Sequence, residues 1–345
     1  MKSYLLIVGT LIAVISALIT LNVFFQQSLQ MEMAEQFNRQ QSLLSKSIAD
    51  NISAYLYFIK QDVRHISNML SKRGITNKRD LDWLTNDALR KKGIIETSLG
   101  ILNTRGEVVF SEDNSNLSKP FIANMLKQTK NIGPGNTTII ETPHLIYIIS
   151  PIYNHESMIG VIFLSIKIND IAGRFVSNIK SGSRGYAWMM DKNGTLLYHP
   201  TQPGMVGGNI YKADSTCFKC HMNFDLEKRI IEGKTSNYGR HIAPTGEDKI
   251  IAFSTVGIDS LSWIIAVSAP YSEVTSATRH SMGLYSYLII SIFITTSVVS
   301  TLLIIFNKKR IKAEAMAKRK EELEKYAVEL EKRVNERTKE LMHAE

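Results

Sequence analysis

The chain of 345 residues contains only two cysteines, so each thiol could form an intrachain disulfide only with the other. A zinc site would need four ligands, and no second pair of cysteine or histidine residues follows at a usable spacing. The sequence also lacks a histidine-kinase histidine box, a nucleotide-binding glycine motif, a cyclase signature and a chemoreceptor hairpin. No catalytic apparatus is therefore expected within these residues.

The two cysteines lie in the stretch Cys217-Phe218-Lys219-Cys220-His221. This spacing is typical of c-type haem attachment, in which each thiol forms a thioether with a haem vinyl group. The adjacent histidine then lies under the ring and ligates the iron. The stretch predicts haem c, bound by Cys217, Cys220 and His221, with His221 as the iron ligand. The alternatives are a redox disulfide, which C-x-x-C also forms, or a free dithiol.

The second axial ligand is left open by the sequence. His199, His241 and Met205 are candidates, because imidazole and thioether groups both ligate haem iron. Met222 adjoins His221 and can hardly reach the opposite face. A protein ligand in this position would indicate a redox sensor, whereas an open position would bind nitric oxide, carbon monoxide or oxygen.

Two uncharged apolar runs predict membrane spans, Tyr4 to Phe25 and Leu284 to Phe306. As a helix the first is about 33 Å long, enough for a bilayer. Lys308, Lys309 and Arg310 follow the second span and place that end in the cytoplasm, and Lys2 agrees. We therefore expect a two-pass protein of the bacterial inner membrane, with residues 1–3 and the C-terminus cytoplasmic and residues 26–283 periplasmic. The periplasm is where the cytochrome c maturation machinery would attach haem.

The formal net charge of +9 does not indicate nucleic-acid binding. Much of the positive charge lies beside the second span and in the C-terminal segment, where it serves topology and contact with anionic membrane lipid.

A long helix is predicted for residues 26–75. Apolar residues recur there mostly every three or four positions, and neither proline nor glycine occurs between residues 26 and 73. Such a helix cannot bury its apolar stripe against itself. It must pack on a domain, on a second copy of the chain, or on both.

A weak internal repeat follows this helix. The stretches 101–110 and 189–198 each predict two strands joined by a glycine turn, at Gly106 and Gly194. A second pair of strands follows each of them, at 146–151 with 160–168 and at 250–256 with 263–270. The second unit has additional residues between its strand pairs, and Cys217 to His221 lie in that interval. The pattern predicts two related α+β units, at residues 76–178 and 179–280.

The chain resembles the double Cache family of extracellular sensor domains, which have a PAS-like fold. The resemblance rests on the long leading helix, the two units and the stretch from Gly185-Tyr186-Ala187-Trp188 through Asp191 and Gly194 to His199-Pro200. It implies a ligand-sensing region over roughly residues 26–280. The amino-acid-binding pattern of this family is not apparent in the first unit. A haem in the second unit would replace, or lie beside, its small-molecule pocket.

The C-terminal segment, residues 307–345, predicts a cytoplasmic coiled coil. Met316, Leu323, Leu330 and Val334 fit the apolar positions of a heptad repeat. The stretch Ala327 to Leu341 resembles the helix that connects a membrane span to the output module of sensor histidine kinases. It implies signalling to a histidine kinase module or a response regulator pathway. Because both membrane spans and the heptad positions run in line, we also expect a parallel homodimer.

The sequence thus predicts a membrane-bound signal-transduction sensor whose periplasmic haem c responds to redox state or to a diatomic gas. Displacement of the link Thr275 to Met282 would transmit the signal to the second span. One alternative is a Cache receptor for a small organic ligand with a Cys217–Cys220 disulfide. Another is a membrane-anchored electron-transfer cytochrome.

Overall fold

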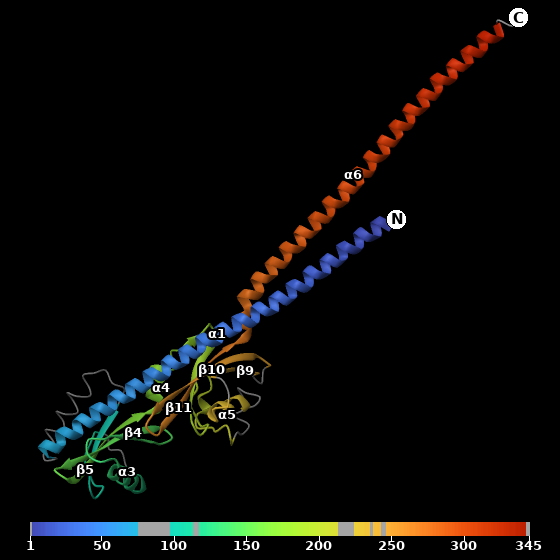
Figure 1. Ribbon diagram of the computed structural model, residues 1–345. Coiled ribbons are helices and arrows are strands. Elements are labelled where there is room, and N and C mark those ends of the chain that lie inside the picture. The colour runs from blue at the N-terminus through green and yellow to red at the C-terminus, as the bar shows by residue number, and fades with distance from the viewer. Residues whose placement is uncertain are drawn as a thin grey trace. The chain divides into compact units, whose positions relative to one another are not determined.

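The computed structural model describes residues 2–74, 97–112, 117–212, 224–234, 237–242 and 246–342. The chain begins with one long helix, α1 (Lys2–Arg73), and ends with another, α6 (Tyr271–Met342); the strands of two antiparallel sheets lie between them in the sequence (Figure 1). The chain divides into two compact parts, which are not the two predicted α+β units. One is Val23–Thr278 and contains both sheets; the other combines Met1–Asn22 with Arg279–Glu345 and consists of the outer parts of the two long helices.

The first sheet has the strand order β2-β1-β5-β4-β3. All of its described pairings are antiparallel. Its strands are β1 (Thr97–Asn103), β2 (Val108–Ser111), β3 (Thr138–Glu141), β4 (Leu145–Asn154) and β5 (Ser157–Lys167).

The second sheet has the order β6-β7-β11-β10-β9, and β8 also pairs with β7. The path β8-β7-β11-β10-β9 repeats the strand order of the first sheet, which confirms the internal repeat predicted from the sequence. Its strands are β6 (Lys180–Ser181), β7 (Gly185–Asp191), β8 (Leu196–Tyr198), β9 (Tyr238–Ile242), β10 (Asp248–Ile258) and β11 (Leu261–Pro270).

Helix α1 packs along one face of both sheets (Figure 1). Its apolar side chains from Ile48 to Leu70 join side chains of both sheets in one buried core. Polar contacts fasten it at each sheet. Ser45 Oγ lies 3.0 Å from Ser254 Oγ of β10, and Ser67 Oγ donates to the Pro151 carbonyl of β4 at 2.6 Å. The predicted long helix is therefore confirmed, and its apolar stripe is buried against the sheets.

Each sheet carries a separate apolar cluster on its opposite face. Helix α3 (Lys119–Ile132) packs over the first sheet, and α5 (Asp225–Ile231) packs over the second. A further short helix, α4 (Ile168–Phe175), follows β5. In the second unit the 3-10 turn η2 (Pro203–Met205) and α5 stand between β8 and β9. This is the position that α3 occupies in the first unit, between β2 and β3.

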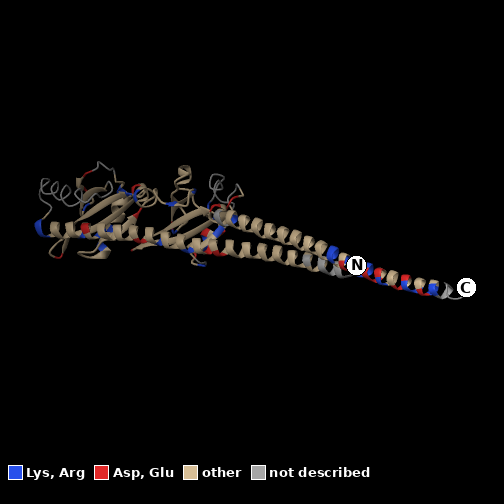
Figure 2. Ribbon diagram, turned by 90° about the horizontal axis from the view of Figure 1, so that it is seen from above, with Lys and Arg blue, Asp and Glu red and all other residues tan. Residues whose placement is uncertain are grey.

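The outer parts of α1 and α6 are joined by one interhelical hydrogen bond among their described residues. In this bond Asn22 Nδ2 donates to Ser286 Oγ at 2.6 Å. Both α1 and α6 contain an apolar stretch long enough to cross a membrane. Figure 2 shows a stretch of α6 without charged residues, followed by a C-terminal part in which both signs alternate. The predicted heptad residues of that part, Met316 and Leu323 among them, are exposed on the single chain.

Candidate functional site

The predicted haem-attachment residues Cys217, Cys220 and His221 lie outside the described residues. Residues 213–223 separate two described flanks, which end at Lys212 and begin again at Phe224. Both flanks belong to the second unit, between β8 and α5. The candidate site is therefore defined by what surrounds the motif.

A pocket lies on the face of the second sheet that carries α5. It has about 450 Å³ of empty space, part of it open to solvent. The described residues that line it are mostly apolar: Trp188, Met190, Gly194, Leu196, His199, Met205, Gly208, Asn209, Ile210, Phe224 and Glu227. Ile210 precedes residues 213–223 and Phe224 follows them, so the pocket borders the motif segment at both of its ends.

The loop that forms one wall of this pocket is fastened to β8 by its backbone. The Leu196 N–H donates to the Gly208 carbonyl, and the Gly207 N–H donates back to the Leu196 carbonyl, each at 2.8 Å. The Ile210 N–H donates to the Gly194 carbonyl at 3.0 Å. These bonds extend the sheet by a short strand-like segment. The wall therefore has a defined position, and Met205 is carried at its start.

His199 is 5% exposed and lines the pocket. Its Nδ1 accepts the backbone N–H of Gln202 at 3.1 Å, and the Tyr186 ring packs edge-on at 5.1 Å between centroids. A backbone N–H can only donate, so Nδ1 has no proton and the neutral ring has its proton on Nε2. In this tautomer the Nδ1 lone pair is engaged and Nε2 carries a proton. His199 is therefore suited to donate a hydrogen bond through Nε2. To ligate iron through Nε2 it would have to move that proton to Nδ1, which could then no longer accept the Gln202 N–H.

Met205 also lines the pocket and is 8% exposed. Its thioether needs no deprotonation to ligate haem iron. His241, the third candidate, lies in β9 opposite Lys249 of β10, and it is not among the described residues that line the pocket. The structure thus brings two of the three predicted ligand candidates, His199 and Met205, together beside the motif segment.

Three further lining residues were not identified as site residues from the sequence. Trp188 packs edge-on against Phe253 with 5.9 Å between ring centroids; the sequence identified it only as part of the Cache-like stretch that begins at Gly185. Glu227 is 1% exposed on α5 and adds a carboxylate to the pocket wall. Phe224 lines the pocket at the start of α5. The proximity of Phe224 and Glu227 to the cysteine motif was the available signal for both.

The corresponding face of the first sheet is filled by its own side chains, within the described ranges. The Phe163 ring lies where a Cβ on Gly100 of the neighbouring strand would stand. Tyr147 packs between Phe163 and Phe121, with ring centroids 6.2 Å and 4.6 Å away. Met125 of α3 is fully buried in the same cluster. The described part of this face is therefore a packed aromatic core.

Two tandem antiparallel sheets of PAS-like strand order behind one long helix define the class of a double extracellular sensor domain. The sequence profile of the Cache domain family, dCache_1, matches residues 25–278. The chain belongs to this family, and its residues 25–278 form the Cache sensor domain of a signalling receptor.

Solved structures of ligand-binding domains share the fold. The ligand-binding domain of the Pseudomonas fluorescens chemoreceptor CtaA with L-isoleucine is 14% identical, with a TM-score of 0.52 over 73% of this chain and 98% of that chain. The Mlp24 domain with asparagine is 17% identical, with a TM-score of 0.52 over 73% and 99%. The Pseudomonas aeruginosa PAO1 amino acid chemoreceptor PctB with L-arginine is 18% identical, with a TM-score of 0.50 over 68% and 96%. Among curated proteins, none matches the sequence.

Proposed function

We propose that this protein is a transmembrane receptor that senses a chemical signal in the pocket of its second Cache unit. The position of that pocket carries the proposal, because its walls continue into both ends of the Cys217–His221 segment. Within the described residues, aromatic side chains fill the corresponding face of the first sheet, which supports the choice of the second unit as the sensing unit. The receptor would pass the signal through α6 to a histidine-kinase-type output.

The occupant that we propose is haem c, held by thioethers to Cys217 and Cys220 and ligated by His221. The pocket residues fit this group in chemistry, since Trp188, Met190, Leu196 and Phe224 offer an apolar surface to a porphyrin. Met205 would supply a thioether ligand to the iron. Bound haem would provide an iron centre that changes oxidation state or binds a diatomic gas. The role of the chain would be to shield that centre from water and to hold Met205 in place, on the loop that is hydrogen-bonded to β8.

A second candidate is a receptor for a small organic ligand, with Cys217 and Cys220 as a disulfide. Its support is the amino-acid complexes of the structurally similar CtaA, PctB and Mlp24 domains. The pocket also has polar groups suited to such a ligand. In its present tautomer His199 is a hydrogen-bond donor, and the Glu227 carboxylate can accept one.

The proposed topology has two spans and the Cache region in the periplasm. Its support is the apolar stretch in each long helix and the lysine and arginine residues that directly follow the second stretch. The proposed state is a homodimer, supported by the exposed heptad residues of α6. Cytochrome c maturation machinery, membrane lipid and a histidine kinase or response regulator pathway are the proposed partners.

The test is to express the full chain in a bacterium with active cytochrome c maturation and to record absorbance spectra beside a haem stain of the denatured protein. Covalent haem predicts a Soret band and a stain that survives denaturation, both lost in Cys217→Ala/Cys220→Ala. Met190→Ala is the matched control, since it alters the pocket and leaves the attachment motif intact. A colourless protein with an oxidised Cys217–Cys220 pair would overturn the haem proposal. Amino acids that raise its Tm would then support the second candidate.

A further inference from the structure

The first turn of α6 is held by the second Cache unit at three successive residues, Tyr271, Ser272 and Glu273. Arg240 of β9 places its guanidinium carbon 4.0 Å from the centre of the Tyr271 ring. Arg184 Nη2 donates to Ser272 Oγ at 3.1 Å. These contacts reach α6 from two opposite edges of the sheet, because β9 ends one edge and the β6–β7 turn lies at the other. Helix α6 itself continues directly from β11 at Pro270.

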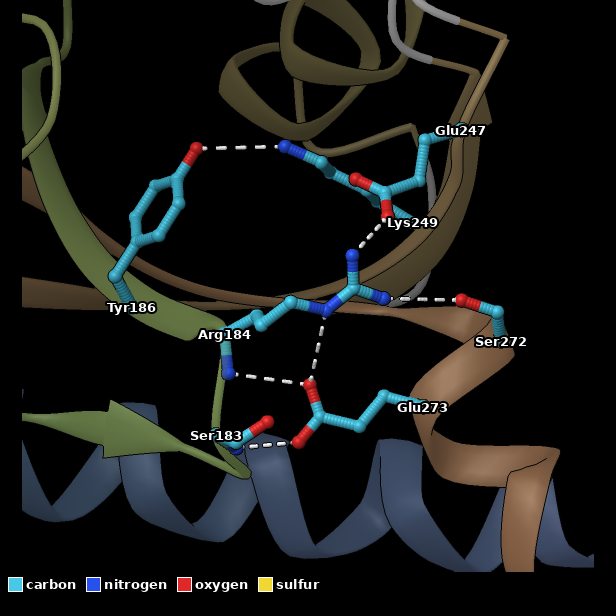
Figure 3. A network of polar contacts seen from close by, with 7 residues as sticks. All are labelled: Ser183, Arg184, Tyr186, Glu247, Lys249, Ser272 and Glu273. Atoms are coloured by element: carbon cyan, nitrogen blue, oxygen red, sulfur yellow. Dashed lines mark hydrogen bonds and ion pairs between the residues drawn. The ribbon is translucent and has the colours of Figure 1, made fainter.

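Glu273 makes the densest of these contacts (Figure 3). Its Oε1 accepts the Ser183 N–H, and its Oε2 accepts the Arg184 N–H at 3.1 Å. The Arg184 side chain also approaches Oε2, with Nε at 3.8 Å. Successive backbone N–H groups in a turn form a concavity suited to an anion. Here the anion is a carboxylate of the same chain, in the first turn of the helix that leaves the sensor domain.

Gly182 makes this concavity possible. It has a φ of +69°, in the left-handed region that favours glycine, and a Cβ there would overlap Glu273 Oε1. Arg184 connects the turn to a third element, because its Nη1 pairs with Glu247 at 2.9 Å just before β10. The turn, the start of β10 and the first turn of α6 therefore share one network of charge-assisted hydrogen bonds.

We propose that residues Gly182 to Arg184 and Glu273 form a latch that couples the second sheet to α6, so that a displacement of the sheet is delivered to the helix. The latch lies at the opposite end of β7 from Met190, which lines the pocket. Because β7 is one continuous strand, a shift caused at the pocket reaches the latch along the backbone. This inference holds whether haem or an organic ligand occupies the pocket.

The test measures backbone amide hydrogen exchange on the full chain in lipid nanodiscs, over a series of low urea concentrations. The coupled segments, residues 185–191 of β7 and residues 274–278 of α6, are expected to open as one cooperative unit with the same urea dependence. Different urea dependences of these two segments in the wild-type protein would overturn the proposal, whatever the variants show.

Two variants break the latch from opposite sides. Gly182→Ala inserts a methyl group where Glu273 Oε1 lies, and Glu273→Ala removes the carboxylate. Each is expected to speed exchange of residues 274–278 at least about tenfold, the consequence of losing one hydrogen bond to a charged group. Protection of β10 and β11 is expected to remain. Loss of protection throughout β10 and β11 as well would show a general folding role and overturn the latch.

The matched control is Gly133→Ala. Gly133 has the same φ of +69°, but a Cβ at this position would have nothing within 4 Å among the described residues. Gly133→Ala therefore measures only the cost of placing alanine at a positive φ, without a steric overlap. Gly133 follows the end of α3 in the first unit. The double variant Gly182→Ala/Glu273→Ala is expected to exchange at residues 274–278 no faster than Glu273→Ala, because no carboxylate remains to be expelled. Additive effects of the two substitutions on that segment would contradict the latch.

Discussion

Trp263 of β11 donates its indole N–H to Glu141 Oε1 of β3 at 2.7 Å. The bond joins the second sheet to the first, and Trp263 is completely buried. Ser260 adds a second link, because its Oγ donates to the Ile139 carbonyl at 3.3 Å. Burial raises the pKa of Glu141 above its usual value, although the Trp263 hydrogen bond acts in the opposite direction. The two Cache units therefore meet at the Glu141 carboxylate.

Glu141→Ala is expected to destabilise the folded chain by about 1–3 kcal/mol, because it leaves the buried Trp263 N–H without its acceptor. Glu141→Gln keeps an acceptor oxygen and is expected to cost less. Urea unfolding followed by tryptophan fluorescence measures both. Glu107→Ala, in an exposed ion pair with Arg105, is the control and is expected to have little effect. Equal costs for the alanine and glutamine variants would contradict this account of the bond.

Stability is expected to depend on pH through Glu141. Its folded-state pKa is raised above the ordinary value of 4.5, so the folded chain binds more protons than the unfolded chain just above pH 4.5. Stability contributed by this group therefore falls as pH rises from 4.5 through the raised pKa. The difference in unfolding free energy between wild type and Glu141→Gln, measured across this window, should shift in favour of the glutamine variant as pH rises. A constant difference would contradict the shift.

The latch at Glu273 is expected to respond to pH with the opposite sign. Hydrogen bonds from the Ser183 backbone, together with Arg184, lower the pKa of Glu273 below its ordinary value of 4.5. Its stabilising contribution is thus complete above pH 4.5 and is lost as pH falls through the lowered pKa. Arg184 and Glu247 are the charged groups beside it, and α1 presents the neutral Gln36 and Gln40.

Hydrogen exchange of residues 274–278, corrected for intrinsic rates, measures this dependence. Protection relative to Glu273→Gln should be constant from neutral pH down to about pH 5, should fall progressively below pH 4.5, and should disappear once the pH is below the lowered pKa of Glu273. Arg105→Ala, which removes an exposed charge far from the latch in the sequence, serves as the control. A loss of protection that begins near neutral pH would show that another group governs the first turn of α6.

In the first sheet, Gly100 of β1 and Phe163 of β5 lie directly opposite each other. Gly100→Ala is expected to destabilise by about 1–3 kcal/mol, the usual cost of overpacking a filled core, because the new methyl group overlaps the Phe163 ring. Phe163→Leu shortens the opposing side chain. The double variant should therefore be more stable than the sum of the two single costs predicts, as chemical denaturation in a double-mutant cycle would measure. Simple additivity would contradict the steric explanation.

In the haem-loaded protein, Met205→Leu is expected to open the second axial position. The reduced variant should then bind carbon monoxide faster than the wild type and show an altered absorbance spectrum. Met158→Leu is matched in chemistry, but Met158 lies in β5 of the first sheet and does not line the pocket, so this variant should leave both measurements unchanged. Identical spectra for wild type and Met205→Leu would exclude Met205 as the axial ligand.

The class of fold could be predicted from local patterns. The period of apolar residues in 26–75 predicted the helix, because one face of a long helix must be buried. The glycine turns at Gly106 and Gly194 predicted paired strands, and the structure confirms the strands on both sides of each turn. These signals lie within short stretches of the chain, so they can be recognised without knowledge of the packing.

The surroundings of the candidate site follow from the packing of the chain. His199, Met205 and Glu227 are separated along the chain, and only the return of the 206–210 loop along β8 and the packing of α5 bring them into one pocket. The tautomer of His199 depends on where the Gln202 N–H points. The latch joins Gly182 to Glu273 across most of the second unit. The repeat, the helices and the cysteine motif could be recognised in the sequence because they depend on neighbouring residues. Contacts between distant residues depend on how the sheets pack, and no local pattern specifies them.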